Sequence, residues 1–92
     1  IQDPFDATPP PIQPLADGSA LIDGRTFIEE INEHFALNLV EAFYDTIAGY
    51  MLSNLGRIPQ VGDLVEDADN RIRLRVEAME RLRVAQVRLE RM

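Results

Sequence analysis

The stretch Asp45–Asp63, DTIAGYMLSNLGRIPQVGD, constrains the fold of this 92-residue chain more than any other part. On a helical projection its apolar residues fall within an arc of about 140°. These residues are Ile47, Ala48, Met51, Leu52 and Leu55, while Tyr50 falls on the polar side. Asp45 or Thr46 can cap the first turn, and Gly56 can end the last one. A helix of about three turns is unstable alone in water, so we expect this one to cover a sheet.

Two alternating runs near the C-terminus predict paired strands. Apolar and charged residues alternate from Arg71 to Ala78, which is the period of a half-buried strand. The run from Arg81 to Arg91 alternates with one phase slip, and a bulge near Ala85–Gln86 would correct it. The residues returned to one face would be Leu82, Val84, Val87 and Leu89. A coiled coil is the alternative, but its apolar seam would not include the β-branched residues of these runs. We therefore favour strands.

The segment before the central helix predicts a hairpin and another helix. Asp17-Gly18 is a hairpin signal between two apolar runs. Thr26 with Glu29 resembles a capping box, and Asn38 can end the helix that follows. The expected buried face of that helix is Phe27, Ile28, Ile31 and Phe35. With a further short strand at residues 62–66, the sequence predicts an α+β fold: an N-terminal hairpin and two helices on a small, mainly antiparallel sheet.

The first 14 residues differ in composition from the rest. They contain five of the six prolines, which disfavour helices and sheet interiors and favour extended chain. We therefore expect residues 1–14 to be a linker and residues 15–92 to be the folded domain. Because no apolar run approaches the roughly 18 residues of a membrane span, we expect no direct membrane insertion by this sequence.

Composition excludes several functional classes. The chain has no cysteine and one histidine, His34, so it lacks the residues of a thiolate or multi-histidine metal site. Ser19 lies beside the expected hairpin turn and Ser53 on the polar side of a helix, so neither resembles an activated nucleophile. We therefore predict that it is not an enzyme. The net charge of −7 disfavours nucleic acid as a partner. This charge is uneven: residues 1–70 hold two arginines against thirteen acids, and residues 71–92 hold seven against three.

Two charged groups are candidate sites. The acidic residues that could hold a divalent cation are Asp63, Glu66, Asp67 and Asp69. They match no calcium-binding loop, so a solvated acidic turn is favoured and they are weak candidates. The other group is Arg71, Arg73 and Arg75, which would project from one strand face as an interaction surface for acidic groups, with Arg81, Arg83 or Arg88 near them. A solvated strand face is the alternative.

Three motifs carry a family resemblance. The DGR turn at Asp23–Arg25, the DT-x-AG start at Asp45 and the LGRIP-x-VGD exit resemble the CorC/HlyC transporter-associated domain. The resemblance covers the chain from about Leu15 to its end. It implies a module at the carboxyl end of membrane proteins that carry a transmembrane region and a pair of CBS domains.

The resemblance also implies a function. We expect a cytosolic accessory module of a hemolysin-like or magnesium and cobalt efflux protein, at the cytoplasmic face of the inner membrane. It would dock on its own CBS-pair region or on a second copy, as a homodimer. The alternative is a sensor for a divalent cation or for an adenine-containing cofactor such as FAD, because the family's fold is related to part of a FAD-binding domain.

Overall fold

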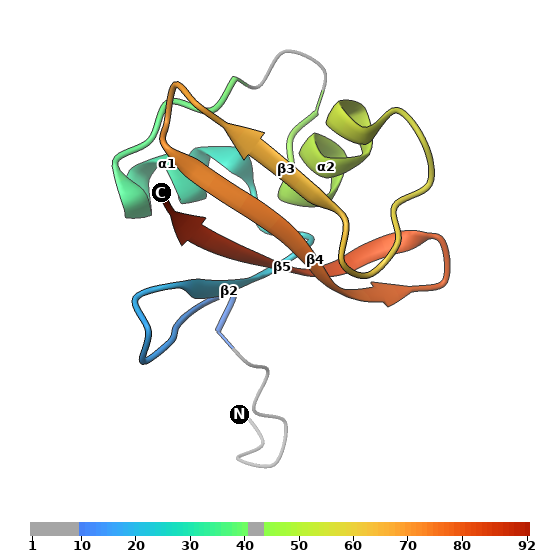
Figure 1. The fold of residues 1–92 in the computed structure, drawn as a ribbon, viewed down its shortest axis with the longest axis horizontal. Coiled ribbons are helices and arrows are strands. Elements are labelled where there is room, and N and C mark those ends of the chain that lie inside the picture. The colour runs from blue at the N-terminus through green and yellow to red at the C-terminus, as the bar shows by residue number, and fades with distance from the viewer. Residues whose placement is uncertain (1–9, 41–43) are drawn as a thin grey trace, which may run out of the picture.

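The computed structural model describes residues 10–40 and 44–92, and it shows two helices on one face of a five-stranded antiparallel sheet (Figure 1). The helices are α1 (Ile28–Phe35) and α2 (Ile47–Leu55), and the strands are β1 (Ile12–Pro14), β2 (Ala20–Asp23), β3 (Leu64–Asp67), β4 (Ile72–Glu80) and β5 (Arg83–Arg91). The strands lie in the order β1-β2-β5-β4-β3. This arrangement confirms the predicted α+β fold. Neither described helix has the length and apolar character needed to cross a membrane.

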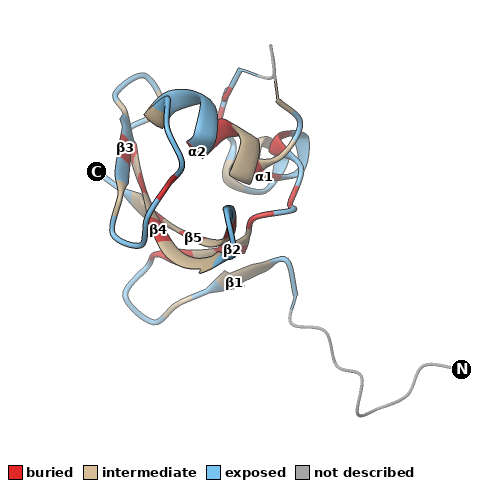
Figure 2. Ribbon diagram, turned by 90° about the vertical axis from the view of Figure 1, so that its right-hand side faces the viewer, coloured by how far each residue is buried: buried red, intermediate tan, exposed pale blue. Residues whose placement is uncertain are grey.

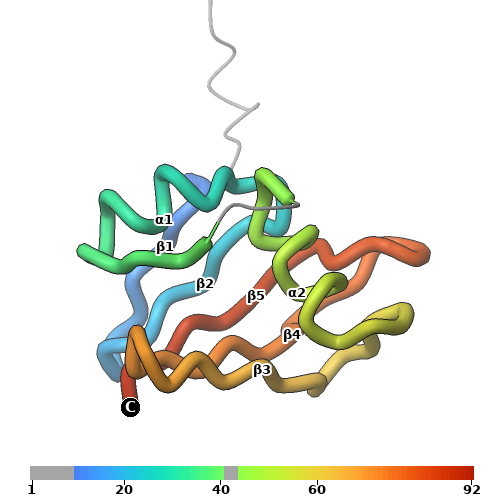
Figure 3. Tube along the Cα trace, turned by 90° about the horizontal axis from the view of Figure 1, so that it is seen from above, coloured from blue at the N-terminus to red at the C-terminus, as the bar shows by residue number. Residues whose placement is uncertain are grey.

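The two faces of the sheet have different roles. Both helices lie on one side, with α1 above the β1–β2 part and α2 above β5 and β4 (Figure 3). Alternate strand residues point into this layer and are buried: Ile22, Ile72, Leu74, Val76, Val87 and Leu89. The other side of the sheet carries no helix from the described parts of the chain (Figure 2). We call it the open face.

The N-terminal hairpin forms as predicted, but the folded region begins earlier than residue 15. Ile12 pairs with Ile22 in the antiparallel β1–β2 ladder, and the connecting loop contains Gly18 at a φ of 88°. Pro14 is tolerated because β1 is an edge strand. The boundary predicted after Pro14 is therefore three residues too late, since β1 starts at Ile12. Residues 1–9 of the predicted linker lie outside the described residues.

The predicted capping box at the start of α1 is wrong. Phe27 occupies the N-cap and makes no side-chain cap hydrogen bond. Thr26 belongs to the preceding turn, where its N–H donates to the Asp23 carbonyl at 3.0 Å. Its carbonyl in turn accepts the N–H of Ile47 at 3.0 Å. These backbone contacts tie the turn to α2 and move the first helical turn one residue along the chain.

The buried face of α1 is narrower than predicted. Ile28 and Ile31 are fully buried, but Phe27 is 61% exposed and lies at the helix start, outside the core. The helix also ends earlier than predicted. Ala36 takes the left-handed conformation at a φ of 56°, so the helix terminates there and does not reach Asn38.

Both ends of α2 are as predicted. The Thr46 hydroxyl accepts the N–H of Gly49 at 3.2 Å, which satisfies a free donor of the first turn. Gly56 closes the last turn at a φ of 69°, and its N–H donates to the carbonyl of Leu52. The cap chemistry therefore fixes residues 47–55 as the helix.

The face that α2 buries differs from the projected one. Tyr50 is only 5% exposed, whereas Leu52, predicted to be buried, is 50% exposed. Tyr50 faces β3, and its hydroxyl donates to a carboxylate oxygen of Asp67 at 3.2 Å. Its ring also meets that of Tyr44 edge-on, with 5.4 Å between centroids. The helix is thus turned so that an aromatic side chain with a polar end fills the space toward β3.

Strands β4 and β5 confirm the preferred interpretation of the C-terminal runs, and the coiled-coil alternative is wrong. Val76 pairs with Val87 and Met79 with Val84, with register shifts between these pairs that leave Ala85 without a partner in the ladder. The predicted bulge is therefore present. It turns three of the four expected residues to the core, but Leu82 lies in the β4–β5 turn and is 72% exposed.

The turn before α1 docks on this bulge. The N–H of Gly24 donates to the carbonyl of Ala85 at 2.9 Å, and its own carbonyl accepts the N–H of Ala48 at 2.9 Å. A Cβ on Gly24 would lie 2.1 Å from the carbonyl oxygen of Val84. Gly24 therefore joins β2, the bulge of β5 and α2 at a point where only glycine fits.

Candidate functional site

The strand register gathers three arginines on the open face. Arg73 and Arg75 alternate with the buried residues of β4, so their side chains leave the sheet on the side without helices. Arg75 lies directly opposite Arg88 of β5, and Arg73 lies opposite Glu90. The sequence left open which of Arg81, Arg83 and Arg88 would lie near the arginines of β4, and the register brings Arg88 beside Arg75. Only the register of β4 on β5 shows this.

The three arginines differ in their acidic partners. The Nε atom of Arg73 lies 3.8 Å from Glu66 on the neighbouring strand. Arg88 pairs with Asp17 of the β1–β2 loop, and its Nε atom lies 3.5 Å from Glu90. Within the described residues Arg75 makes no ion pair. The half-buried guanidinium of Arg75 therefore faces that of Arg88 in the middle of the sheet, and no carboxylate of the described residues is paired with it.

Apolar residues flank this pair of arginines. Leu21 of β2 is the register partner of Arg88, and Leu64 of β3 is the partner of Arg75. The row Leu21–Arg88–Arg75–Leu64 thus crosses four strands. Like charges directly opposite each other destabilise a sheet. The contact between Arg75 and Arg88 therefore lowers the stability of the domain. The same row presents two guanidinium groups, each able to bind a carboxylate through two hydrogen bonds, with apolar residues beside them. This combination suits recognition of a carboxylate-bearing surface.

Arg71 does not belong to the row. It lies in the turn before β4 with a φ of 55°, and its N–H donates back to the carbonyl of Ala68 at 3.3 Å. Of the three arginines predicted to form an interaction surface, Arg73 and Arg75 share the open face, and Arg71 is exposed at the strand end.

The four candidate cation ligands have separate partners. Asp63 accepts two hydrogen bonds from Arg57, both at 2.9 Å. Asp67 accepts hydrogen bonds from Tyr50 and from Asn70. Glu66 points to the open face beside Arg73, and Asp69 is exposed in the turn. Within residues 10–40 and 44–92, no three acidic or histidine side chains converge as a metal site.

These contacts predict how stability depends on pH. Arg57 lowers the pKa of Asp63, and a hydrogen bond from Ser19 lowers that of Asp17. Burial raises the pKa of Asp67, but hydrogen bonds from Asn70 and Tyr50 outweigh it and the net shift is downward. The unfolded carboxyls titrate near pH 3.9, so this stabilisation is complete above about pH 4 and is lost as the pH falls through the folded pKa values.

We expect the free energy of unfolding to vary little near neutral pH and to decrease below about pH 4, measured by urea denaturation at several pH values. Asp63→Asn should make this decrease at acid pH smaller. Asp69→Asn removes a neighbouring exposed carboxylate that makes no ion pair within the described residues, and it is the matched control. If the free energy of unfolding decreased identically at acid pH in the two variants, the assigned role of the Arg57–Asp63 pair would be contradicted.

Comparison with known proteins agrees with this architecture. The family model for the CorC_HlyC transporter-associated domain matches residues 13–92. The chain is 37% identical to the UPF0053 protein sll0260 of Synechocystis, over 85% of this chain and 18% of that protein. It is 28% identical to the magnesium and cobalt efflux protein CorC of Buchnera aphidicola, over 95% of this chain and 31% of that protein. The chain thus spans less than a third of either relative.

A solved structure has the same fold. The transporter-associated domain of a Xylella fastidiosa hemolysin, in complex with magnesium and manganese, superposes with a TM-score of 0.82. The two are 31% identical, and the match covers 90% of this chain and 99% of that one. With the family match over nearly the whole chain, these likenesses show that the chain belongs to the CorC/HlyC transporter-associated domain family.

Proposed function

We propose that this domain is a regulatory, non-catalytic docking module of a longer CorC-type membrane protein. The observation that carries the proposal is Arg75, which lies opposite Arg88 on the open face and has no ion pair among the described residues. The domain would dock through the Leu21–Arg88–Arg75–Leu64 row on an acidic surface of the protein's own CBS-pair region. It would act at the cytoplasmic side of the membrane and influence transport of divalent ions such as magnesium or cobalt.

Charge reversal tests this proposal. We expect Arg75→Glu to weaken binding of the separately expressed CBS-pair region at least about tenfold, measured by isothermal titration calorimetry, because a charge that faces acidic groups is inverted. The same change should raise the stability of the free domain by about 0.2–1 kcal/mol, because an opposite-charge pair replaces the Arg75–Arg88 contact.

Arg71→Glu is the matched control, since it makes the same charge change in the turn outside the row. Equal losses of affinity for the two variants would show that only net charge matters and would refute the row as the docking site. A homodimer through the same face is a second form of docking. It predicts concentration-dependent sedimentation of the wild-type domain that Arg75→Glu abolishes.

A divalent-cation sensor is the second candidate function. Its support is the related Xylella fastidiosa domain, whose structure is in complex with magnesium and manganese. Thermal melts with Mg²⁺ and Mn²⁺ test it, and FAD and ATP belong in the same series because an adenine-containing cofactor remains a prediction. A ligand at about 100 times its dissociation constant should add roughly 2.7 kcal/mol. If Asp63→Asn and Asp67→Asn leave a cation-induced shift intact, these carboxylates are not its ligands.

A further inference from the structure

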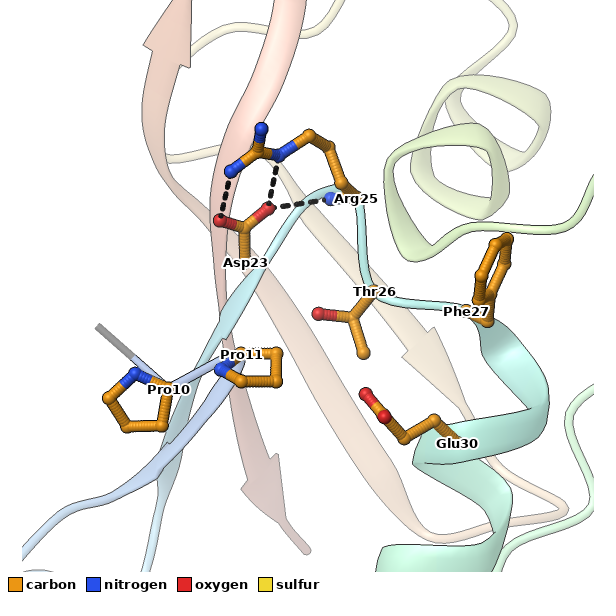
Figure 4. Close-up of a pocket in the computed structure, with 7 residues that line it drawn as sticks. All are labelled: Pro10, Pro11, Asp23, Arg25, Thr26, Phe27 and Glu30. Atoms are coloured by element: carbon orange, nitrogen blue, oxygen red, sulfur yellow. Dashed lines mark hydrogen bonds and ion pairs between the residues drawn. The ribbon is translucent and has the colours of Figure 1, made fainter. Parts of the chain in front are cut away.

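A concave site lies where β1 begins and β2 ends, beside the start of α1. Its volume is about 400 Å³, and Pro10 and Pro11 form one apolar wall (Figure 4). Thr26 and Glu30 line the side toward the helix, and Phe27 contributes to the rim. Most of the lining is apolar, with a few polar groups, as in sites that bind small organic groups.

The hydroxyl of Thr26 is the unusual group in this pocket. Thr26 is only 5% exposed, and its Oγ1 atom has no hydrogen-bond partner among the described residues. Figure 4 shows this oxygen directed toward the space in front of Pro11. Because Phe27 is the N-cap, the hydroxyl does not cap α1. A buried hydroxyl without a partner lowers stability, so a group that enters the pocket and bonds to it would be favoured.

The charged residues around the pocket determine whether a bound group should be a cation or an anion. Arg25 is already engaged by Asp23, with two side-chain contacts of 3.2 Å. Glu30 is exposed and makes no ion pair within the described residues, so the charged lining of Asp23, Arg25 and Glu30 has a net negative charge. An anion would meet this excess of negative charge, whereas a cation would be attracted by it.

We propose that this pocket binds an organic cation, a guanidinium or ammonium group on an apolar stem. An N–H of the cation donates to Thr26 Oγ1, the carboxylate of Glu30 balances its charge, and the stem lies against Pro10 and Pro11. A free amine and a Lys or Arg side chain of a polypeptide offer this same chemistry.

Titration of the ¹⁵N-labelled chain followed by NMR tests the proposal, with n-butylguanidinium chloride as the probe and sodium butyrate as a control with a similar stem. We expect saturable shifts at residues 26–30 with the cation and none with butyrate. Thr26→Val should weaken binding at least tenfold while the melting temperature stays the same or rises, since the isosteric change removes a hydroxyl that has no partner in the described part of the chain. Glu30→Gln should weaken binding to a similar degree.

Glu33→Gln is the control for charge, because Glu33 is an exposed acid of α1 outside the pocket. The blocked peptide acetyl-Gly-Arg-Gly-amide separates the two sources: tenfold tighter binding than the butyl probe supports a polypeptide ligand, and equal binding supports a free cation. No saturable binding at about 10 mM cation, equal binding of butyrate, or an unchanged affinity in Thr26→Val would overturn the proposal.

Discussion

Gly24→Ala is expected to lower the free energy of unfolding by more than about 3 kcal/mol, a large share of the stability of a small domain. The added Cβ would lie 2.1 Å from the carbonyl oxygen of Val84, which is backbone and cannot rotate away. Relief of this contact requires the turn to separate from β5. That movement would also stretch the hydrogen bonds from Gly24 to Ala85 and from Ala48 to Gly24.

Thermal denaturation followed by circular dichroism measures this effect, and the midpoint should fall by more than about 10 °C. Gly18→Ala is the control: Gly18 has a φ of 88° with no atom within 4 Å of the added Cβ. That variant should lose only about 1 kcal/mol, from the left-handed backbone conformation. If Gly24→Ala were no more destabilising than Gly18→Ala, the close approach of the turn to the bulge would be refuted.

Tyr50→Ala is expected to destabilise the domain by about 3–5 kcal/mol, whereas Leu52→Ala should cost less than about 1 kcal/mol. Tyr50 is buried between α2 and β3 and donates a hydrogen bond to Asp67. Leu52 is half-exposed on the same helix. The helical projection of the sequence predicts the opposite order, so this pair of variants directly tests the orientation of α2.

Urea denaturation of both variants provides the measurement, and Tyr50→Phe separates packing from hydrogen bonding. Loss of the hydroxyl alone should cost about 1 kcal/mol, because Asp67 keeps its bonds from Asn70. A larger loss for Leu52→Ala than for Tyr50→Ala would show that the other face of α2 is buried.

Much of the secondary structure could be predicted from the sequence because it depends on neighbouring residues. Thr46 and Gly56 define the ends of α2 through local hydrogen bonding and a left-handed backbone. The alternation in residues 71–78 identifies β4, and its phase assigns Arg73 and Arg75 to the solvent side. The local pattern at Thr26 fits a cap and misplaces the start of α1, because backbone contacts of Thr26 with Ile47 and Asp23 put the cap at Phe27.

The candidate sites depended on contacts between distant residues. Nothing local indicates that Arg88 faces Arg75, because register is set when the whole apolar face of β5 is matched to β4. The acidic residues 63–69 are adjacent in sequence, but the strand alternates their directions, and Arg57, Arg73 and Tyr50 engage three of them separately. The pocket at Thr26 likewise joins residues of the N-terminal segment to α1.

Local sequence was enough to predict the α+β class, the hairpin, the ends of α2 and the alternation of the long strands, because backbone preferences and apolar periodicity act over a few residues. The packed structure was needed to show that Tyr50 is buried, that Gly24 meets the bulge at Ala85 and that Arg75 opposes Arg88. It also shows that the Thr26 hydroxyl has no hydrogen-bond partner among the described residues. Each of these contacts depends on how neighbouring helices and strands pack together, and that packing is set by residues far apart in the chain.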